Sequence, residues 1–190
     1  MNEFRERFEA VRGATLRELE AALSLVDPAS AERLKDEILT AGKVFFVGVG
    51  RVMLALQCIV KRLAHLGLSA HFVGEVTEPA IGPGDLLVVG SGSGSTLFPL
   101  AIAGKAKAIG AKVVHIGSNP DSPMKEYADC MVRIPVRTKQ YLDDEIDSSQ
   151  PLTSLFEQCL LLLGDIIAGL IIEEKSLDMK ELWRHHANLE

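Results

Sequence analysis

Short apolar runs alternate with longer segments of helical periodicity over most of the chain. The apolar runs have the length of buried strands and lie at 44–47, 70–73, 86–89, 112–117 and 130–135. Segments with helical spacing, such as 53–66 and 97–109, separate them. This alternation predicts right-handed βαβ units and therefore an α/β fold: a three-layer sandwich with a five-stranded parallel sheet between helices, of the flavodoxin-like kind.

Two further helices are predicted before the first strand. Apolar residues from Phe4 to Val26 recur at helical spacing until Asp27-Pro28 interrupts them, and a second helix reaches Ala41. Neither helix offers a reactive group, so we expect an antiparallel pair that serves assembly. The predicted organisation is a helical segment, 1–42, and a main domain, 43–190, that ends in a helical tail over 177–190.

The most informative stretch runs from Gly90 to Thr96, Gly-Ser-Gly-Ser-Gly-Ser-Thr, between a predicted strand and a predicted helix. Glycines allow a tight turn and a close approach to a ligand, while hydroxyls and the free N–H groups of a helix N-terminus are donors for an anion. The pattern indicates a phosphate-binding turn. The alternative is a flexible linker, but linkers rarely join a strand to an amphipathic helix.

A second glycine turn, Gly48-Val49-Gly50-Arg51, follows the first predicted strand. A dinucleotide fingerprint would need glycine where Met53 stands, so nucleotide binding is disfavoured. Because the carboxyl ends of parallel strands share one edge of a sheet, we expect both glycine turns to contribute to one site.

Composition narrows the class of protein. The 190 residues carry a formal net charge of −6, which disfavours a nucleic-acid partner. The N-terminus lacks the features of an export signal, which predicts a cytoplasmic location, and Cys159–Ile172 is interrupted by polar residues and glycines and predicted too short to span a membrane. Cys58, Cys130 and Cys159 lack metal-ligand spacing and are predicted to be buried thiols.

Carboxylates occur in two contexts. The polar segment 138–150 is predicted to be a surface or lid loop, with Asp143, Asp144 and Glu145 as a solvated face. Glu157 and Asp165 lie within the apolar helix predicted over 152–172. Such a carboxylate is either a favourable charge at a helix start or a group with a raised pKa that transfers protons, and the sequence leaves both open.

The motifs together resemble the sugar isomerase (SIS) domain family, and within it the 6-phospho-3-hexuloisomerases. The resemblance is carried by the two glycine turns, by Lys61–Gly67, by Val73-Gly74-Glu75, by Gln150–Gln158 and by the ending His186-Ala187-Asn188-Leu189-Glu190. It implies a homotetramer that converts 3-hexulose 6-phosphate to fructose 6-phosphate through an enediol. It also implies function beside a 3-hexulose-6-phosphate synthase in formaldehyde fixation, with no metal or organic cofactor.

The resemblance also assigns roles to residues. The phosphate would be held by Ser91, Ser93 and Thr96 with backbone N–H groups from Gly92 to Ser95, Gly94 included. Glu157 would be the general base. His186 would shuttle protons or help open the ring, in its own or a neighbouring subunit's site. Gly48, Gly50, Arg51 and Glu75, at strand ends, would position the sugar.

One departure from the family pattern affects the expected activity. The first turn usually reads GxGRSG, whereas Val52-Met53 stands here in place of Ser-Gly. A lost hydroxyl donor costs about 1 to 3 kcal/mol if its partner stays unpaired. Two alternatives therefore stay open: a non-catalytic protein that binds sugar phosphates, and an isomerase of another phosphosugar such as arabinose 5-phosphate.

Overall fold

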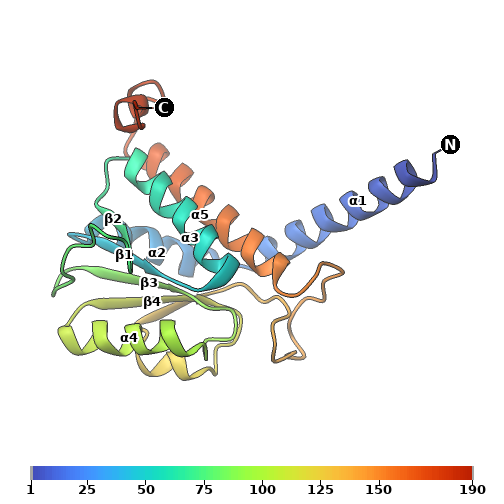
Figure 1. The fold of residues 1–190 in the computed structure, drawn as a ribbon, viewed down its shortest axis with the longest axis horizontal. Coiled ribbons are helices and arrows are strands. Elements are labelled where there is room, and N and C mark those ends of the chain that lie inside the picture. Colours follow the sequence, from blue (N-terminus) through green and yellow to red (C-terminus); the bar gives the residue numbers. More distant parts are fainter. Residues whose placement is uncertain (1, 190) are drawn as a thin grey trace.

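A computed structural model describes residues 2–189 and shows a five-stranded parallel sheet between two layers of helices (Figure 1). The predicted α/β three-layer sandwich is confirmed. The strands are β1 (Val44–Val47), β2 (Ala70–Phe72), β3 (Leu86–Gly90), β4 (Lys112–Gly117) and β5 (Cys130–Arg133). The helices are α1 (Glu3–Ser24), α2 (Pro28–Thr40), α3 (Gly50–His65), α4 (Leu97–Ile109) and α5 (Ser154–Glu174), with 3-10 turns η1 (Pro123–Glu126) and η2 (Glu181–His185).

The strand order β2-β1-β3-β4-β5 places a change of direction between β1 and β3. The chain leaves β1 towards β2 on one side and leaves β3 towards β4 on the other. In open α/β sheets, ligands bind beyond the carboxyl ends of the strands at such a point. The two glycine turns follow β1 and β3 and therefore meet there.

Both faces of the sheet are buried at its centre, which explains why β1 and β3 are apolar at every position. Phe46 and Val88 face the layer of α2, α3 and α5, whereas Phe45 and Val89 face α4 and η1. In Figure 1, α3 and α5 lie side by side over one face of the sheet, and α4 covers the other.

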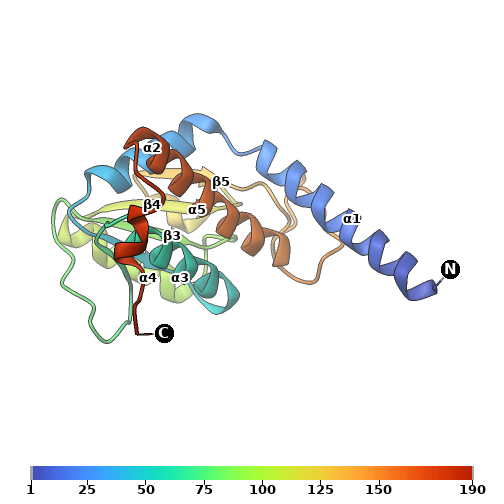
Figure 2. The ribbon, with the colours of Figure 1, turned by 90° about the horizontal axis from the view of Figure 1, so that it is seen from above.

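The two N-terminal helices do not form the predicted antiparallel pair. The chain enters along α1, which projects from the body, and then turns into α2 beside the sheet (Figures 1 and 2). The C-terminal part of α1 packs on α5, while α2 packs on β5 and α5. Helical spacing predicts a helix but not the element against which it packs. The domain boundary at residue 42 stays a prediction.

Three local predictions were wrong. The tail forms only the 3-10 turn η2 within a mostly irregular segment, not a helix over 177–190. Among the thiols, only Cys159 is fully buried, whereas Cys58 is exposed on α3 and Cys130 is half-buried. Glu145, predicted to be solvated, is 7 % exposed.

Helix α5 spans Ser154–Glu174, close to the predicted 152–172, and extends well beyond the apolar stretch 159–172 that was predicted too short to span a membrane. At 21 residues, with mean hydropathy 2.0 over its most apolar window, it could cross a membrane by length and composition alone. Within the described chain, however, 56 % of that window is buried against the rest of the fold. Its apolar character is that of a core helix packed between α3, α1 and α2.

Candidate functional site

A cavity of about 200 Å³ opens at the carboxyl ends of β1 and β3. Two glycine turns, the start of α5 and the loop after β5 surround it. It is lined by Val49, Gly50, Arg51, Val52, Gly90, Ser91, Gly92, Ser93, Thr96, Thr138, Lys139, Thr153, Phe156 and Glu157. The predicted meeting of the two glycine turns is therefore present.

Three helices direct their N-termini at this cavity. The N-cap residues of α3, α4 and α5 are Val49, Thr96 and Thr153, and all three line it. None of these side chains bonds to the first-turn N–H groups of its own helix. Each helix end carries about half a positive charge, so three free ends at one cavity favour an anion strongly.

The turn between β3 and α4 has the backbone geometry that its glycines predicted. Gly94 has φ +62°, in the left-handed region, and a Cβ there would lie 2.1 Å from Ser122 Oγ. A Cβ on Gly92 would lie 2.9 Å from Thr138 Cγ2. The hydroxyls of Ser91 and Thr96 lie 3.4 Å apart, across the mouth of the turn. Only glycine lets this backbone lie so close to β4 and to the loop after β5.

A buried histidine, His115, holds the backbone of the turn between β3 and α4 in place. His115 Nε2 lies 2.8 Å from the carbonyl oxygen of Ser91. A carbonyl can only accept a hydrogen bond, so Nε2 carries the proton and donates. Burial lowers the pKa of His115, and the bond to Ser91 opposes that shift only in part. The imidazole is therefore neutral at pH 7 and acts as a fixed donor that orients the Ser91 peptide.

Glu157 is the carboxylate of the cavity. It lies in the first turn of α5, is 8 % exposed, and accepts a hydrogen bond of 2.8 Å from Thr153 Oγ1. Its other oxygen pairs with Nε of Arg51, whose side chain is 66 % exposed. Arg51 thus covers the carboxylate on its solvent side, and one cavity holds a buried negative charge beside an accessible positive one.

Sequence reasoning missed four residues of the lining: Thr138, Lys139, Thr153 and Phe156. Thr153 and Phe156 lie in the segment Gln150–Gln158 that carries the family resemblance. Their closeness to Glu157 in the sequence was the signal that could have identified them as site residues. Thr138 and Lys139 stand on a long loop, and no local pattern shows where such a loop returns to the sheet.

The structure brings Gly50, Arg51, Ser91, Gly92, Ser93, Thr96 and Glu157 together, but it places five other predicted residues outside the lining: Gly48, Glu75, Gly94, Ser95 and His186. Gly48 is buried at the end of β1, where a Cβ would lie 2.8 Å from Leu56 Cδ1. Gly94 is buried, and the side chain of Ser95 turns back to Ser93, with 3.2 Å between the hydroxyls. Glu75 lines a separate cavity on the other side of α3 and bonds to His71 at 2.9 Å. Their assigned roles stay predictions.

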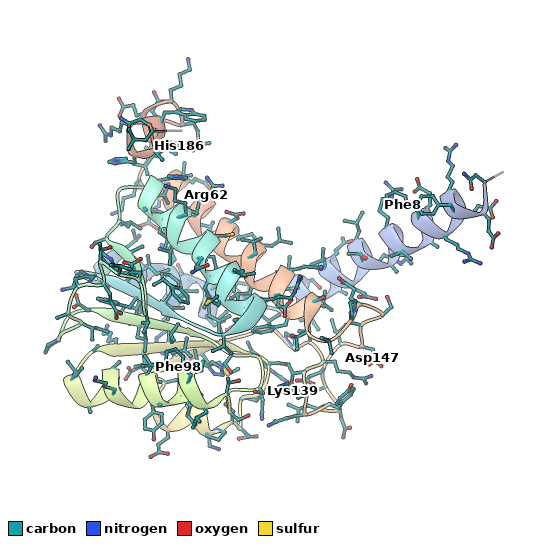
Figure 3. The ribbon with its side chains drawn as sticks, in the orientation of Figure 1. Phe8, Arg62, Phe98, Lys139, Asp147 and His186 are labelled. Carbon is teal, nitrogen blue, oxygen red and sulfur yellow. The ribbon has the colours of Figure 1, made fainter. Side chains whose placement is uncertain are left out.

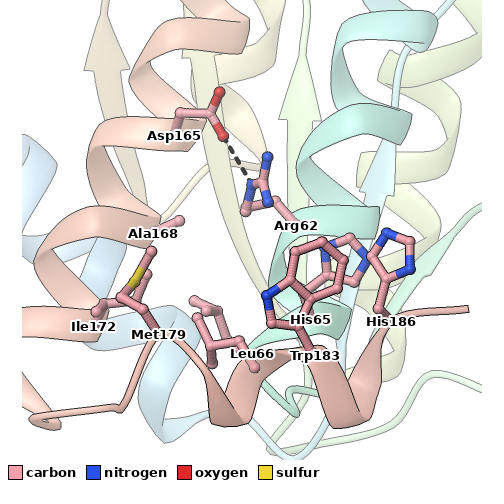
Figure 4. A pocket seen from close by; sticks show the side chains of 10 residues that line it. Arg62, His65, Leu66, Asp165, Ala168, Ile172, Met179, Trp183 and His186 are labelled. Carbon is pink, nitrogen blue, oxygen red and sulfur yellow. Dashed lines mark hydrogen bonds and ion pairs between the residues drawn. The ribbon is translucent and has the colours of Figure 1, made fainter.

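His186 lies far from Glu157 in the same chain. It is beyond the C-terminal ends of α3 and α5, whereas Glu157 and Arg51 are at their N-terminal ends (Figure 3). There it lines a cavity of about 510 Å³ with His65 and Trp183 (Figure 4), and the rings of His65 and His186 stack with centroids 5.0 Å apart. The helices run the length of the sheet, so a single chain cannot bring both residues to one substrate.

Metal ligands are not grouped in the described part of the chain. Between residues 2 and 189, no three His, Cys, Asp or Glu side chains lie close enough together to hold a metal ion. The chemistry available in the cavity is that of hydroxyls, helix N-termini, two cations and one carboxylate.

The fold, the two glycine turns and the anion-binding cavity define a class of phosphosugar-binding proteins, and the chain belongs to the SIS domain family, whose model matches residues 37–163. Two curated relatives are named 3-hexulose-6-phosphate isomerase. That of Bacillus subtilis (strain 168) is 38 % identical over 92 % of this chain and 95 % of its own length, and that of Mycobacterium gastri is 41 % identical over 87 % and 82 %.

A solved structure extends the similarity to the whole fold. A protein of Methanococcus jannaschii, described as a hypothetical protein whose structure infers the function of 3-hexulose-6-phosphate isomerase, is 32 % identical. It superposes with a TM-score of 0.79 over 97 % of this chain and 99 % of its own. The predicted family membership is confirmed.

Proposed function

We propose that the protein is an isomerase that converts 3-hexulose 6-phosphate to fructose 6-phosphate. The observation that carries the proposal is a single cavity in which three helix N-termini and a hydroxyl-rich turn lie beside a buried carboxylate. An anion site alone would serve any phosphorylated ligand. The carboxylate adds a base at the place where the rest of a sugar phosphate has to lie. The identity of the substrate is inferred from the names of the two curated relatives.

The phosphate binds at the turn between β3 and α4. Ser91, Ser93 and Thr96 donate their hydroxyls, and the free N–H groups at the start of α4 complete the contacts. A bound phosphate holds the carbon chain in register, which makes proton transfer effectively intramolecular.

Glu157 removes the proton from C2 of the 3-ketose. The electron pair forms the C2–C3 double bond of an enediol as the carbonyl oxygen at C3 accepts a proton. Return of the proton to C3, with loss of the hydroxyl proton at C2, gives the 2-ketose. Thr153 holds one oxygen of the carboxylate in place while the other reacts.

Arg51 has to release that second oxygen before Glu157 can act as a base. The guanidinium pairs with Glu157. A substrate with oxygens on C2 and C3 offers Arg51 other acceptors, and the largely exposed side chain is free to turn towards them. Substrate binding then uncovers the base and places a cation beside the developing enediolate.

The assembly we propose is a homotetramer in the cytoplasm, working beside a 3-hexulose-6-phosphate synthase. The surface supports association. Phe4, Phe8 and Val11 are exposed on the projecting part of α1, and Ile166 and Leu170 are exposed on α5. Apolar side chains in such stripes favour contact with another subunit. In that assembly His186 acts in a neighbouring subunit's site, which accounts for its distance from Glu157.

The test is turnover of 3-hexulose 6-phosphate by the purified protein and by the Glu157→Gln variant. Glutamine keeps the size of the side chain and an acceptor for Thr153 but cannot take a proton. We expect kcat to fall at least about a hundredfold, as for removal of a general base, with little change in KM.

The matched control is Glu174→Gln at the C-terminal end of the same helix, which removes a carboxylate that pairs with Lys35 outside this cavity. It should retain near-normal kcat. A near-normal rate in Glu157→Gln would remove Glu157 from the mechanism. Binding of fructose 6-phosphate without any turnover by the unaltered protein would instead identify a sugar-phosphate sensor.

A further inference from the structure

The charges around the cavity leave one cation unpaired. Arg51 and Lys139 are the basic residues of the lining, and Arg51 is engaged by Glu157. Lys139 makes no ion pair or hydrogen bond within residues 2–189. A phosphate monoester carries close to two negative charges at pH 7. The helix N-termini neutralise part of the phosphate charge. The ammonium group of Lys139 is the remaining positive charge that can neutralise the rest.

The loop that carries Lys139 is anchored at a buried carboxylate. Glu145, 7 % exposed, accepts hydrogen bonds from Ser118 Oγ at 2.7 Å and from Leu142 N at 2.9 Å. The backbone N–H of Thr138 donates to it at 3.3 Å. A buried carboxylate is costly unless several donors surround it, so this one ties both arms of the loop together. Ser118, just beyond β4, fixes that unit to the edge of the sheet that carries the cavity.

A second anchor fastens the outer part of the loop. Arg133, the last residue of β5, holds both carboxylate oxygens of Asp144 at 2.6 and 2.8 Å. Its Nε donates to the carbonyl of Ser118 at 2.7 Å. Bidentate pairs of this kind set orientation as well as distance. Asp144 and Glu145 therefore hold the loop in place through internal contacts.

These anchors bring the loop onto the phosphate-binding turn. Thr138 is buried, and its methyl lies so near Gly92 that a Cβ on that glycine would be 2.9 Å away. On the other side of Lys139, Gln140 accepts a hydrogen bond from Asn119 beyond β4. Lys139 is thus held between two fixed neighbours at the rim of the cavity (Figure 3).

We propose that Lys139 binds the phosphate group of the substrate as its principal counter-charge, and that Glu145 is the positioning residue that sets the ammonium group over the turn. The inference rests on the proposed function for the identity of the phosphorylated ligand. Lys139 belongs to a loop outside the glycine turns, and Glu145 contributes to binding by holding that loop in place.

The test is direct binding, measured by calorimetry with fructose 6-phosphate and separately with inorganic phosphate, to the unaltered protein and to Lys139→Met. Methionine keeps the length and apolar stem of lysine without its charge. We expect affinity for both ligands to fall at least about tenfold, since one charge-assisted contact is lost. The dependence of affinity on salt should also become shallower. In turnover, KM should rise by a similar factor while kcat changes less than about threefold.

Lys105→Met is the matched control, because Lys105 is exposed on α4 and lies outside the lining. Glu145→Gln should raise KM in the same sense, and Lys139→Arg should recover part of the lost affinity. If Lys139→Met binds both ligands as the unaltered protein does, the inference is overturned while the proposed function stands. If the unaltered protein binds phosphate but turns over no sugar, only the proposed function fails. Binding of neither ligand overturns both.

Discussion

At the scale of single residues, Val52 stands where the resemblance leads us to expect serine, and its surroundings explain what the valine does. Its Cγ1 methyl lies over the ends of β1 and β3, 3.1 and 3.0 Å from where a Cβ would stand on Gly48 and Gly90. The side chain also packs against the core while lining the cavity. Valine thus fills the space above two glycines, a packing role that serine could not take.

Two substitutions separate packing from hydrogen bonding at this position. Val52→Ser should lower the free energy of unfolding by about 1 to 2 kcal/mol through loss of two methyl groups. Val52→Thr keeps one methyl and adds the hydroxyl, so we expect a smaller loss together with a KM reduced by up to about tenfold. Urea unfolding and substrate kinetics on both variants measure the two effects. An unchanged KM in Val52→Thr would mean that the site has no use for the hydroxyl.

At the scale of elements, α1 is fastened to the segment that leads into α5. Glu18 accepts hydrogen bonds from Ser148 Oγ at 2.7 Å, Ser149 N at 2.9 Å and Ser149 Oγ at 2.6 Å. The amide of Gln150 donates at 3.2 Å. That segment precedes Thr153 and Glu157, so the contact ties the projecting helix to the start of α5.

This contact predicts a pH dependence of stability. Partial burial raises the pKa of Glu18, but the hydrogen bonds from Ser149, Ser148 and Gln150 outweigh it and lower the pKa from 4.5 to about 2. A depressed carboxyl pKa stabilises the fold above the unfolded value and loses that contribution as pH falls through the folded value. The contribution of Glu18 is therefore complete above about pH 5 and declines towards pH 2.

Glu18→Gln should accordingly lower the free energy of unfolding by about 1 kcal/mol at pH 7. The difference from the unaltered protein should shrink as pH falls from 5 to 3. Urea unfolding at a series of pH values measures it, with Glu20→Gln on the exposed side of α1 as the control. A difference that stayed constant over that range would contradict the assignment to the Glu18 carboxylate.

At the scale of the whole molecule, the separation of Glu157 from His186 makes a prediction about subunits. If each site takes Glu157 from one chain and His186 from another, two inactive variants can restore one another. Glu157→Gln and His186→Ala, each inactive alone, should regain on the order of a quarter of full activity when refolded together, because half of random pairs are mixed and each mixed pair has one intact site.

The measurement is turnover by the co-refolded mixture, compared with each variant refolded alone. A mixture that includes Phe8→Asp in both chains is the control. Phe8 is 54 % exposed on α1, and a charge there should weaken association and with it the recovery. No recovery in the first mixture, in an assembly shown by light scattering to be mixed, would place His186 outside the shared site.

Local patterns were sufficient for the sheet and for the glycine turn between β3 and α4. Strands such as Leu86–Gly90 are buried on both faces, so their apolar runs needed no knowledge of their neighbours to be found. The glycines of the turn were equally easy to recognise in the sequence. Gly94 is required by its left-handed backbone conformation, and Gly92 by the close contact of the backbone with Thr138. Parallel strands then required both glycine turns to lie at one edge.

The sequence by itself thus determined the fold class, the glycine turn after β3 and the family, since each rests on patterns within a few residues or on motifs in order. Only the tertiary structure decided that Lys139 lies at the cavity, that Glu145 is buried, and that Glu157 and His186 are at opposite ends of the helices. These depend on contacts between residues far apart in the chain, whose free energies come from the packing of the whole fold and have no local signature.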